Sequence, residues 1–309
     1  MRCLITGASG HLGSFLTRLL LTRGHKVLAL ARPPSDFWRL EDVLRDIHVL
    51  RAEPAEWPSC RGEVVRFAPE TVFHLGWAGV TANARNDQAL MTENVAQSLA
   101  LFRLTEASGC RTWVGIGSQA EYGPQARPLT EDMPTRPVTA YGAAKLRVGT
   151  TLATSCERAG IRLVWLRLLA TYGPKDDARH LIPSVTLQLL ARRRPALTRG
   201  EQRWDYLYVA DAAEAVLAVA ECERAAGVYN LGSGEAVAVR CIVEKLRDLI
   251  DPSLPLGLGE LPYREDQLML LQADIGKLRA ATGWTPTTAL DDGLGKTAEW
   301  YRRNGRTGE

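Results

Sequence analysis

The sequence is poor in several features that would assign it to a specialised class of protein. Its 309 residues include only 7% aromatic residues, and 38 basic and 35 acidic side chains leave a formal charge of +3. So small an excess argues against a nucleic-acid or membrane-surface partner, because such partners need a concentrated basic patch. No apolar run reaches the roughly 18 residues of a membrane-spanning helix, and we expect no signal peptide.

Cysteine pairs are also missing. The six cysteines stand singly, with no CxxC pair, at Cys3, Cys60, Cys110, Cys156, Cys222 and Cys241. This spacing predicts neither a metal site nor a disulfide framework. A reducing, cytoplasmic location is therefore expected.

The first 30 residues carry the clearest pattern that is present. A short apolar strand at residues 3–5 runs into a glycine turn, and apolar residues then recur at helical spacing up to Gly24. A second apolar run follows at residues 27–30. Strand, helix and strand in this order form a βαβ unit and predict a parallel sheet.

The same rhythm continues along the chain. We expect strands at 71–75, 112–116, 162–168, 206–209 and 228–230, helices at 87–107, 140–158, 181–194 and 211–223, and a closing amphipathic helix from Leu290 to Tyr301. The fold class is therefore α/β, a Rossmann-type doubly wound sheet with a smaller C-terminal substrate lobe. Residues 1–172 form the dinucleotide-binding domain, to which the chain returns at 203–245, and residues 173–202 and 246–309 form the lobe.

A glycine-rich turn separates the first predicted strand from the first helix. It contains Gly7, Gly10 and Gly13, with His11 and Leu12 between the last two. Glycines there permit a tight turn and let the backbone approach a pyrophosphate at the helix N-terminus. Because a strand precedes the turn and an amphipathic helix follows it, we predict a dinucleotide site and not an ordinary βα turn.

Arg32 stands about 20 residues beyond this turn, at the position where dinucleotide-binding proteins contact the 2′ position of the adenosine ribose. An acid there bonds the 2′-hydroxyl of NAD, whereas an arginine accommodates the 2′-phosphate of NADP. The sequence thus favours NADP(H), with NAD(H) as the alternative. The competing interpretation is a solvated arginine at a strand end, since Pro33 and Pro34 begin a surface turn.

Tyr141 and Lys145 are four residues apart, on one face of the helix predicted at 140–158. A cation near a phenol favours the phenolate and brings its pKa toward the range of a general acid or base. Ser118, at the end of the preceding strand, would supply a hydroxyl to the same oxygen. We predict that these three residues form the catalytic group.

Sequence blocks along nearly the whole chain match a known pattern. In order they are TGASGHLG (6–13), FHLGWAG (73–79), Asn94, GSQAEYG (117–123), AYGAAK (140–145), RLLATYGP (167–174), RWDYLYVAD (203–211), YNLGSGEAV (229–237) and ADIGKLRAATGWTP (273–286). In these blocks the chain resembles the extended short-chain dehydrogenase/reductases that act on nucleotide sugars. Many blocks in order are far more specific than any one of them.

The resemblance implies roles for individual residues. Tyr141 would exchange a proton with the reacting sugar oxygen, Lys145 would hold the nicotinamide ribose, and Ser118 would bind the substrate oxygen. Leu75 and Gly76 would join the cofactor contacts. The resemblance also implies a homodimer, formed through a four-helix interface that includes the helices at 87–107 and 140–158.

Departures from the family pattern narrow the reaction. The family's 4,6-dehydratases place an Asp-Glu pair where this chain has Gln119 and Ala120, and these cannot relay protons to a leaving hydroxyl. Arg264 matches one diphosphate-binding arginine of the family. The family's second diphosphate-binding arginine is expected at the position of Trp204. In this chain Arg203, one residue earlier, would have to take over that contact.

We therefore expect NADPH-dependent reduction of a nucleotide-diphospho-4-keto-6-deoxyhexose at C4. The first alternative is an NAD-dependent nucleotide-sugar 4-epimerase, which would use the same three residues and retain its cofactor. The second is a dinucleotide-binding protein without catalysis, which the presence of Ser118, Tyr141 and Lys145 disfavours. His74 is expected to be a core histidine and Asn94 a brace for the backbone near the site.

Overall fold

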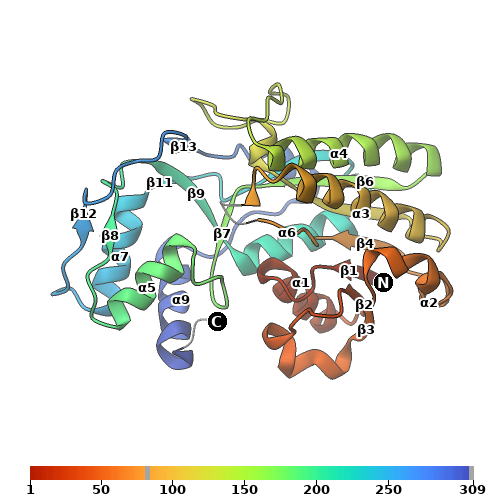
Figure 1. Cartoon of the computed structure of the whole chain (residues 1–309), viewed down its shortest axis with the longest axis horizontal. Coiled ribbons are helices and arrows are strands. Elements are labelled where there is room, and N and C mark those ends of the chain that lie inside the picture. Colours follow the sequence, from red (N-terminus) through yellow and green to blue (C-terminus); the bar gives the residue numbers. More distant parts are fainter. Residues whose placement is uncertain (81–83, 306–309) are drawn as a thin grey trace.

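The computed structural model describes residues 1–80 and 84–305. Its elements form a large part around one parallel sheet and a smaller part at the other end of the molecule (Figure 1). Among the described residues, no helix is long and apolar enough to cross a membrane.

The large part is a seven-stranded parallel sheet with the order β10-β6-β5-β4-β1-β2-β3. Its strands are β1 (Arg2–Thr6), β2 (Lys26–Ala31), β3 (His48–Arg51), β4 (Thr71–His74), β5 (Thr112–Ser118), β6 (Arg162–Leu168) and β10 (Gly227–Leu231). The chain runs outward from β1 to β3, then returns to β4 and runs outward on the other side. The carboxyl ends of β1 and β4 thus mark the switch point, where such sheets bind ligands. This order confirms the predicted doubly wound sheet.

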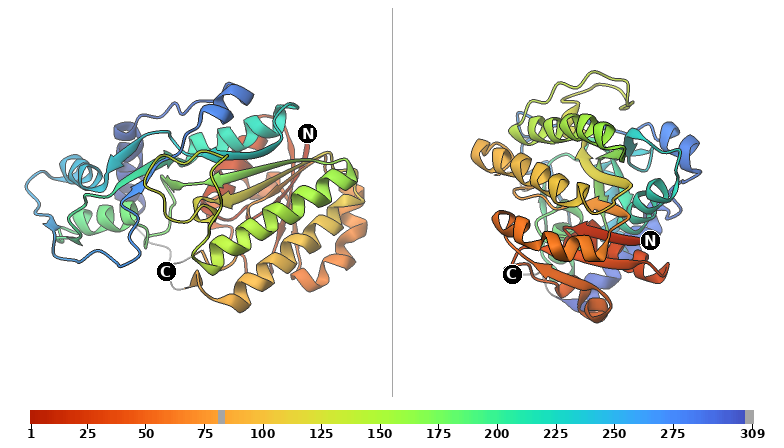
Figure 2. Two further views of the ribbon diagram at one scale, coloured as in Figure 1. Left: turned by 90° about the horizontal axis from the view of Figure 1, so that it is seen from above. Right: turned by 90° about the vertical axis from the view of Figure 1, so that its right-hand side faces the viewer.

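Helices cover both faces of this sheet (Figure 2). On one face lie α1 (His11–Thr22) and α6 (Val209–Glu221), and on the other lie α2 (Arg61–Phe67), α3 (Gln88–Glu106) and α4 (Ala140–Ala159). Along β1, Cys3 and Ile5 pack into the first core, whereas Leu4 packs into the second. Strands buried on both faces consist of continuous apolar residues, which is why residues 3–5 could be recognised as a strand.

The smaller part, the lobe, packs around three helices, α5 (Leu181–Leu190), α7 (Val239–Ile250) and α9 (Leu290–Asn304). Its central strand β9 (Arg203–Tyr208) pairs with β7 (Ala170–Tyr172), β11 (Ala236–Ala238) and β13 (Leu270–Leu271). The two-residue strands β8 (Ala196–Leu197) and β12 (Gly257–Leu258) pair with each other. The last helix before α9 is α8 (Gly276–Thr282), and it contacts β10 and α6 of the large part.

The division of the chain into two domains stays a prediction. Its expected borders place α7 mainly with the dinucleotide-binding domain and α8 with the lobe. The packing differs, because Ile242 of α7 is buried among lobe residues and Leu278 of α8 is buried in the core of the large part. The apolar faces of α7 and α8 predict that each helix is buried on one side, but they do not indicate against which of the two cores each helix packs. Residues 306–309 of the expected lobe lie outside the described residues.

Most predicted elements are confirmed, although several borders move. Strand β9 begins at Arg203 and not at 206, and the helix expected to reach 194 ends at Leu190. The stretch from Pro33 to Pro58, whose structure is the hardest to predict from the sequence, holds β3 and the 3-10 helix η1 (Trp38–Asp46), and the 3-10 helix η2 (Pro54–Cys60) begins within it. Strand β3 has only four residues at the edge of the sheet and lacks a continuous apolar run, so its pattern is weak.

Asp205 joins three segments of the fold. Its buried carboxylate accepts hydrogen bonds from the backbone N–H groups of Ser233 (2.6 Å), Gly234 (3.0 Å) and Ala273 (3.1 Å). Asp205→Ala would leave these donors without their acceptor, at about 1–3 kcal/mol each. We expect the free energy of unfolding, measured by urea denaturation, to fall by at least about 3 kcal/mol.

The exposed Asp248→Ala variant is the control for this experiment. Within the described part of the chain its carboxylate is bonded only to the neighbouring Arg247 side chain, so we expect a change within about 0.5 kcal/mol. Equal losses in the two variants would contradict the bridging role of Asp205.

Candidate active site

The glycine turn after β1 packs against itself so closely that it excludes side chains. Gly7 has a φ of +73°, and a Cβ there would lie 2.7 Å from the Gly76 nitrogen. A Cβ on Gly13 would lie 2.0 Å from the Gly7 oxygen. In the described residues no side chain caps α1, so its first backbone N–H groups are available to an anion. These features fit the pyrophosphate of a dinucleotide.

His11, the first residue of α1, connects this turn to the lobe. Its Nε2 lies 3.1 Å from the Pro174 oxygen and its Nδ1 lies 3.3 Å from the Asp176 carboxylate. Burial is the main reason that the pKa of His11 is lowered. Asp176 also accepts a hydrogen bond from His180 Nδ1 at 2.9 Å. The His11 and Leu12 side chains are thus engaged within the fold, and their backbone N–H groups belong to the uncapped first turn of α1.

Arg32 directly follows β2, beside the glycine turn in the sheet order. Its carbonyl accepts a hydrogen bond from Ser35 N at 3.0 Å, which closes the turn through Pro33 and Pro34. The Arg32 side chain is exposed, and within residues 1–80 and 84–305 its guanidinium makes no hydrogen bond or ion pair. The group is therefore available to a phosphate.

The structure brings Ser118 and Tyr141 together. Ser118 is the last residue of β5, and Tyr141 lies in the first turn of α4, where Thr139 caps the helix through the Gly142 N–H at 3.1 Å. Tyr141 N donates to the Arg85 oxygen at 2.8 Å, which fixes this turn further. Burial raises the pKa of Tyr141, and a hydrogen bond with Ser118 opposes that rise.

Lys145 lies one turn further along α4 and is buried. Its Nζ donates to the Ile116 oxygen at 2.7 Å and lies 3.8 Å from the centre of the Trp77 ring, with the Tyr141 ring at 5.8 Å. Burial lowers the pKa of Lys145 to about 7, against the opposing charge of Glu121. The ammonium therefore titrates near neutral pH.

Two polar side chains support the backbone that follows β4. His74 lies between Thr6 Oγ1 at 2.8 Å and Ser98 Oγ at 2.9 Å, and burial lowers its pKa to about 3. It is thus a neutral core histidine, as expected. Asn94 accepts from Ala78 N and donates to Ala78 O, each at 2.9 Å, which agrees with its expected role as a brace.

Leu75 and Gly76 are held by the end of β1. Leu75 N donates to the Thr6 oxygen at 3.2 Å, and Gly76 N donates to Thr6 Oγ1 at 3.1 Å. The two predicted cofactor contacts therefore lie directly beside the glycine turn.

A comparison with known families agrees with this geometry. The profile of the NAD dependent epimerase/dehydratase family matches residues 3–232, which is most of the chain. The chain belongs to this family. It is an NAD(P)-dependent enzyme of the extended short-chain dehydrogenase/reductase type, in the group that acts on nucleotide sugars.

Relatives within the family have more than one activity. The chain is 28% identical to a UDP-glucose 4-epimerase of Corynebacterium glutamicum, over 93% of this chain and 91% of that protein. It is 24% identical to a dTDP-4-dehydro-6-deoxyglucose reductase of Escherichia coli, over 97% of each. The structure of a Thermotoga maritima UDP-glucose 4-epimerase with UDP-glucose has a TM-score of 0.88, at 24% identity over 99% of this chain and 100% of that one. This last similarity concerns the fold.

The two arginines that the family pattern suggests for a diphosphate lie on the lobe, each with another partner. Arg203 in β9 donates to the Ala236 oxygen at 2.8 Å, and Arg264 contacts Asp266 at 3.3 Å. Trp204, which occupies the family's arginine position, donates its Nε1 to the Leu268 oxygen at 2.8 Å. Substrate binding by Arg203 and Arg264 therefore stays a prediction.

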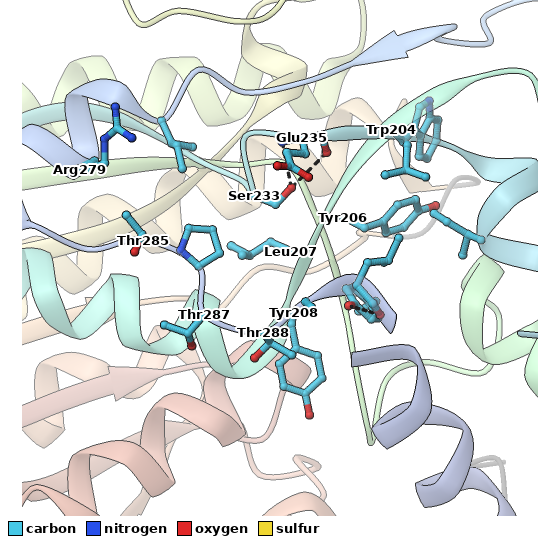
Figure 3. A pocket seen from close by; sticks show the side chains of 17 residues that line it. Trp204, Tyr206, Leu207, Tyr208, Ser233, Glu235, Arg279, Thr285, Thr287 and Thr288 are labelled. Carbon is cyan, nitrogen blue, oxygen red and sulfur yellow. Dashed lines mark hydrogen bonds between the residues drawn. The ribbon is translucent and has the colours of Figure 1, made fainter. Parts of the chain in front are cut away.

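A pocket of about 550 Å³ lies elsewhere in the lobe, between β9 and the segment 285–290 (Figure 3). Its labelled wall residues are Trp204, Tyr206, Leu207, Tyr208, Ser233, Glu235, Arg279, Thr285, Thr287 and Thr288. Neither the glycine turn nor Ser118, Tyr141 or Lys145 lines it. This pocket is therefore separate from the candidate active site.

Sequence reasoning missed two residues beside the catalytic group. Trp77 lies against Lys145, and Glu121 lies behind Ser118, where its carboxylate accepts from Ser118 N at 2.8 Å. Both stand within quoted blocks, FHLGWAG and GSQAEYG, without an assigned role. A charged residue three positions after the end of a buried strand was the available signal for Glu121.

The lowered pKa of Lys145 leads to a prediction about cofactor affinity. If the ammonium holds the ribose, its contribution is present below about pH 7 and is lost as the pH rises through that value. We expect the Kd for NADPH, measured by fluorescence titration between about pH 6 and pH 9, to rise over this range. The Lys145→Met variant lacks the ammonium but keeps the pH dependence that comes from the cofactor's own phosphates, so it is the reference for this measurement. The same pH dependence in both proteins would contradict the prediction.

Proposed function

We propose that this enzyme uses NADPH to reduce the 4-keto group of a nucleotide-diphospho-4-keto-6-deoxyhexose. The observation that carries the proposal is Arg32, whose exposed guanidinium follows β2 beside the glycine turn and is available to a 2′-phosphate. NADPH is the cofactor that a reductase consumes. The near end-to-end similarity to the Escherichia coli reductase also supports this reaction.

Three residues of the chain have distinct tasks in this proposal. A bound dinucleotide would supply the hydride that reduces the carbonyl carbon. Tyr141 donates its phenolic proton to the carbonyl oxygen, so that a ketone becomes an alcohol. Ser118 hydrogen-bonds the same oxygen and orients it, and Lys145 holds the nicotinamide ribose and favours the phenolate left on Tyr141.

Dehydration of the sugar is disfavoured by the residues after Ser118. Elimination of water requires groups that move protons, and the relevant positions of this chain hold Gln119 and Ala120 in the short helix η4 (Gln119–Glu121). The carboxylate of Glu121 cannot take their place, because it is completely buried and bonded to three donors.

A nucleotide-sugar 4-epimerase is the second candidate, and the comparisons give a specific reason to test it. The relatives include UDP-glucose 4-epimerases from Corynebacterium glutamicum and Streptomyces lividans, each 28% identical to this chain. A Thermus thermophilus UDP-glucose 4-epimerase solved with NAD has a TM-score of 0.87, at 24% identity. An epimerase would oxidise and re-reduce C4 with the same residues and without net consumption of cofactor.

One experiment separates the two candidates. The purified protein is incubated with NADPH and dTDP-4-dehydro-6-deoxyglucose, and separately with UDP-glucose and no added cofactor. The proposal expects loss of the nicotinamide absorbance in proportion to alcohol formed in the first assay. Formation of UDP-galactose in the second, together with NAD that copurifies with the protein, would instead establish the epimerase.

Tyr141→Phe tests the proposed proton donor. The substitution removes the hydroxyl and keeps the ring against Trp77, so we expect turnover to fall by about 10²- to 10⁴-fold. The Kd for NADPH should change little, because the ammonium of Lys145 remains. Near-native turnover in steady-state assays would show that another group donates the proton.

Arg32→Asp tests the cofactor preference. A charge-assisted arginine contact contributes roughly 1.5 to 3 kcal/mol, so the native protein should bind NADPH about 10- to 150-fold more tightly than NADH. The carboxylate would repel the 2′-phosphate and accept from a ribose hydroxyl, which reverses this order. Titration of both cofactors measures it, with the exposed Arg66→Asp on α2 as the charge-matched control. Equal native affinities would mean that Arg32 only faces solvent.

A further inference from the structure

Glu121 is a completely buried carboxylate that nothing in the proposed chemistry uses. It ends the short helix η4, directly after β5. Its Oε1 accepts from Ser118 N at 2.8 Å and from Trp165 Nε1 at 3.0 Å, and its Oε2 accepts from Arg167 Nε at 2.8 Å. One of its three donors is therefore the backbone of the proposed catalytic serine.

Three glycines make room for this arrangement. A Cβ on Gly117 would lie 2.4 Å from both the Glu121 carboxylate and Trp165 Nε1. A Cβ on Gly115 would lie 2.5 Å from the Trp165 ring, and one on Gly149 would lie 2.8 Å from it. Two strand positions and one helix position are thus without side chains where the indole and the carboxylate lie.

Arg167 holds the other side of the carboxylate. It is buried in β6, and its guanidinium lies 4.4 Å from the centre of the Tyr122 ring. Tyr122 in turn donates to Asn230 Oδ1 at 2.7 Å. A buried ion pair loses so much hydration that apolar residues of similar volume often stabilise a fold equally well. Stability alone is therefore a poor reason for Glu121 and Arg167.

The hydroxyl of Ser118 is oriented by the same turn. Its Oγ accepts from Ala120 N at 3.1 Å, while Glu121 binds the Ser118 N–H. The Ser118 hydroxyl keeps its own proton to donate, and the side chain of Ser118 lies near enough to Tyr141 to lower the pKa of the phenol. Both the backbone and the side chain of the serine are therefore fixed by η4.

We propose that Glu121 is a positioning residue. Held by Arg167, it fixes the Ser118 backbone so that the Ser118 hydroxyl donates to the substrate carbonyl oxygen, the same oxygen that Tyr141 protonates. This inference rests on the proposed roles of Ser118 and Tyr141. It adds a fourth residue, and its anchor, to the group on which turnover depends.

The charge of Glu121 supplies an independent signature. Burial dominates both neighbouring titrations, lowering the pKa of Lys145 and raising that of Tyr141, and the Glu121 charge raises both. Of the other charged or titratable groups in residues 1–80 and 84–305, Arg85 lowers the pKa of Tyr141, and His74 is itself affected by the charge of Lys145. Neutralising Glu121 should therefore move both pKa values downward.

Glu121→Gln is the principal test, since it keeps the shape and removes the charge. We expect kcat for NADPH-dependent reduction of dTDP-4-dehydro-6-deoxyglucose to fall by about 10²-fold, as for a misplaced catalytic group, with KM nearly unchanged. If the native protein shows only epimerisation of UDP-glucose, kcat for that reaction is measured instead. The pH at which NADPH binding weakens should also shift downward, and this readout needs no sugar substrate.

Asp211→Asn is the matched control. This buried carboxylate accepts from Thr287 Oγ1 at 3.0 Å and Thr288 N at 2.9 Å, away from Ser118, Tyr141 and Lys145. We expect it to lower the thermal unfolding midpoint without changing kcat or the pH dependence of NADPH binding. If Glu121→Gln behaves in the same way, Glu121 is only structural and the proposal is overturned.

Two further variants keep the outcome decisive. Ser118→Ala distinguishes failure of the proposed function from failure of the positioning role. Native turnover in Ser118→Ala would show that the serine has no catalytic role. Loss of turnover in Ser118→Ala but not in Glu121→Gln would overturn only the positioning role of Glu121. If Glu121→Gln does not fold, Glu121→Leu/Arg167→Met replaces the ion pair by apolar side chains. A folded double variant with kcat lowered about 10²-fold would support the proposal, and one with native kcat would overturn it.

Discussion

The close approach of the turns after β1 and β4 is the constraint on which the rest of the site depends. Gly7 lies so near the Gly76 nitrogen that a methyl group would not fit between them. This contact brings two carboxyl strand ends together at the switch point of the sheet. Strand β5 lies next to β4, so Ser118 ends at the same edge, and α4 crosses there with Tyr141 and Lys145. The glycine turn and the three residues predicted to be catalytic are thus neighbours because of strand order.

Features with a local cause could be predicted from the sequence. The strands of the sheet consist of short apolar runs because they are buried on both faces, and the glycine turn is recognisable because backbone geometry there tolerates no side chain. Tyr141 and Lys145 were predicted from their spacing along one helix. Ser118 was predicted from its place at the end of the strand that precedes this helix, and the resemblance added the substrate oxygen as its partner.

Features that depend on distant residues could not be predicted in this way. The role of Glu121 requires Trp165 and Arg167, which arrive from a different strand, and Gly149, which arrives from a helix. Each looks ordinary alone. The same holds for the lobe, where two-residue strands such as β8 and β12 exist only through their pairing, and where amphipathic helices do not specify their partners.

The side chain of His11 gives the two parts of the molecule a mechanical connection at the cofactor turn. It reaches from the first residue of α1 to Pro174 and Asp176, and the Asp176 backbone oxygen also accepts the hydroxyl of Tyr301 from α9. A movement of the lobe away from the sheet must therefore pull on the helix start that would bind the pyrophosphate, or break these contacts first. The contacts of His11 therefore couple the position of the lobe to the start of α1.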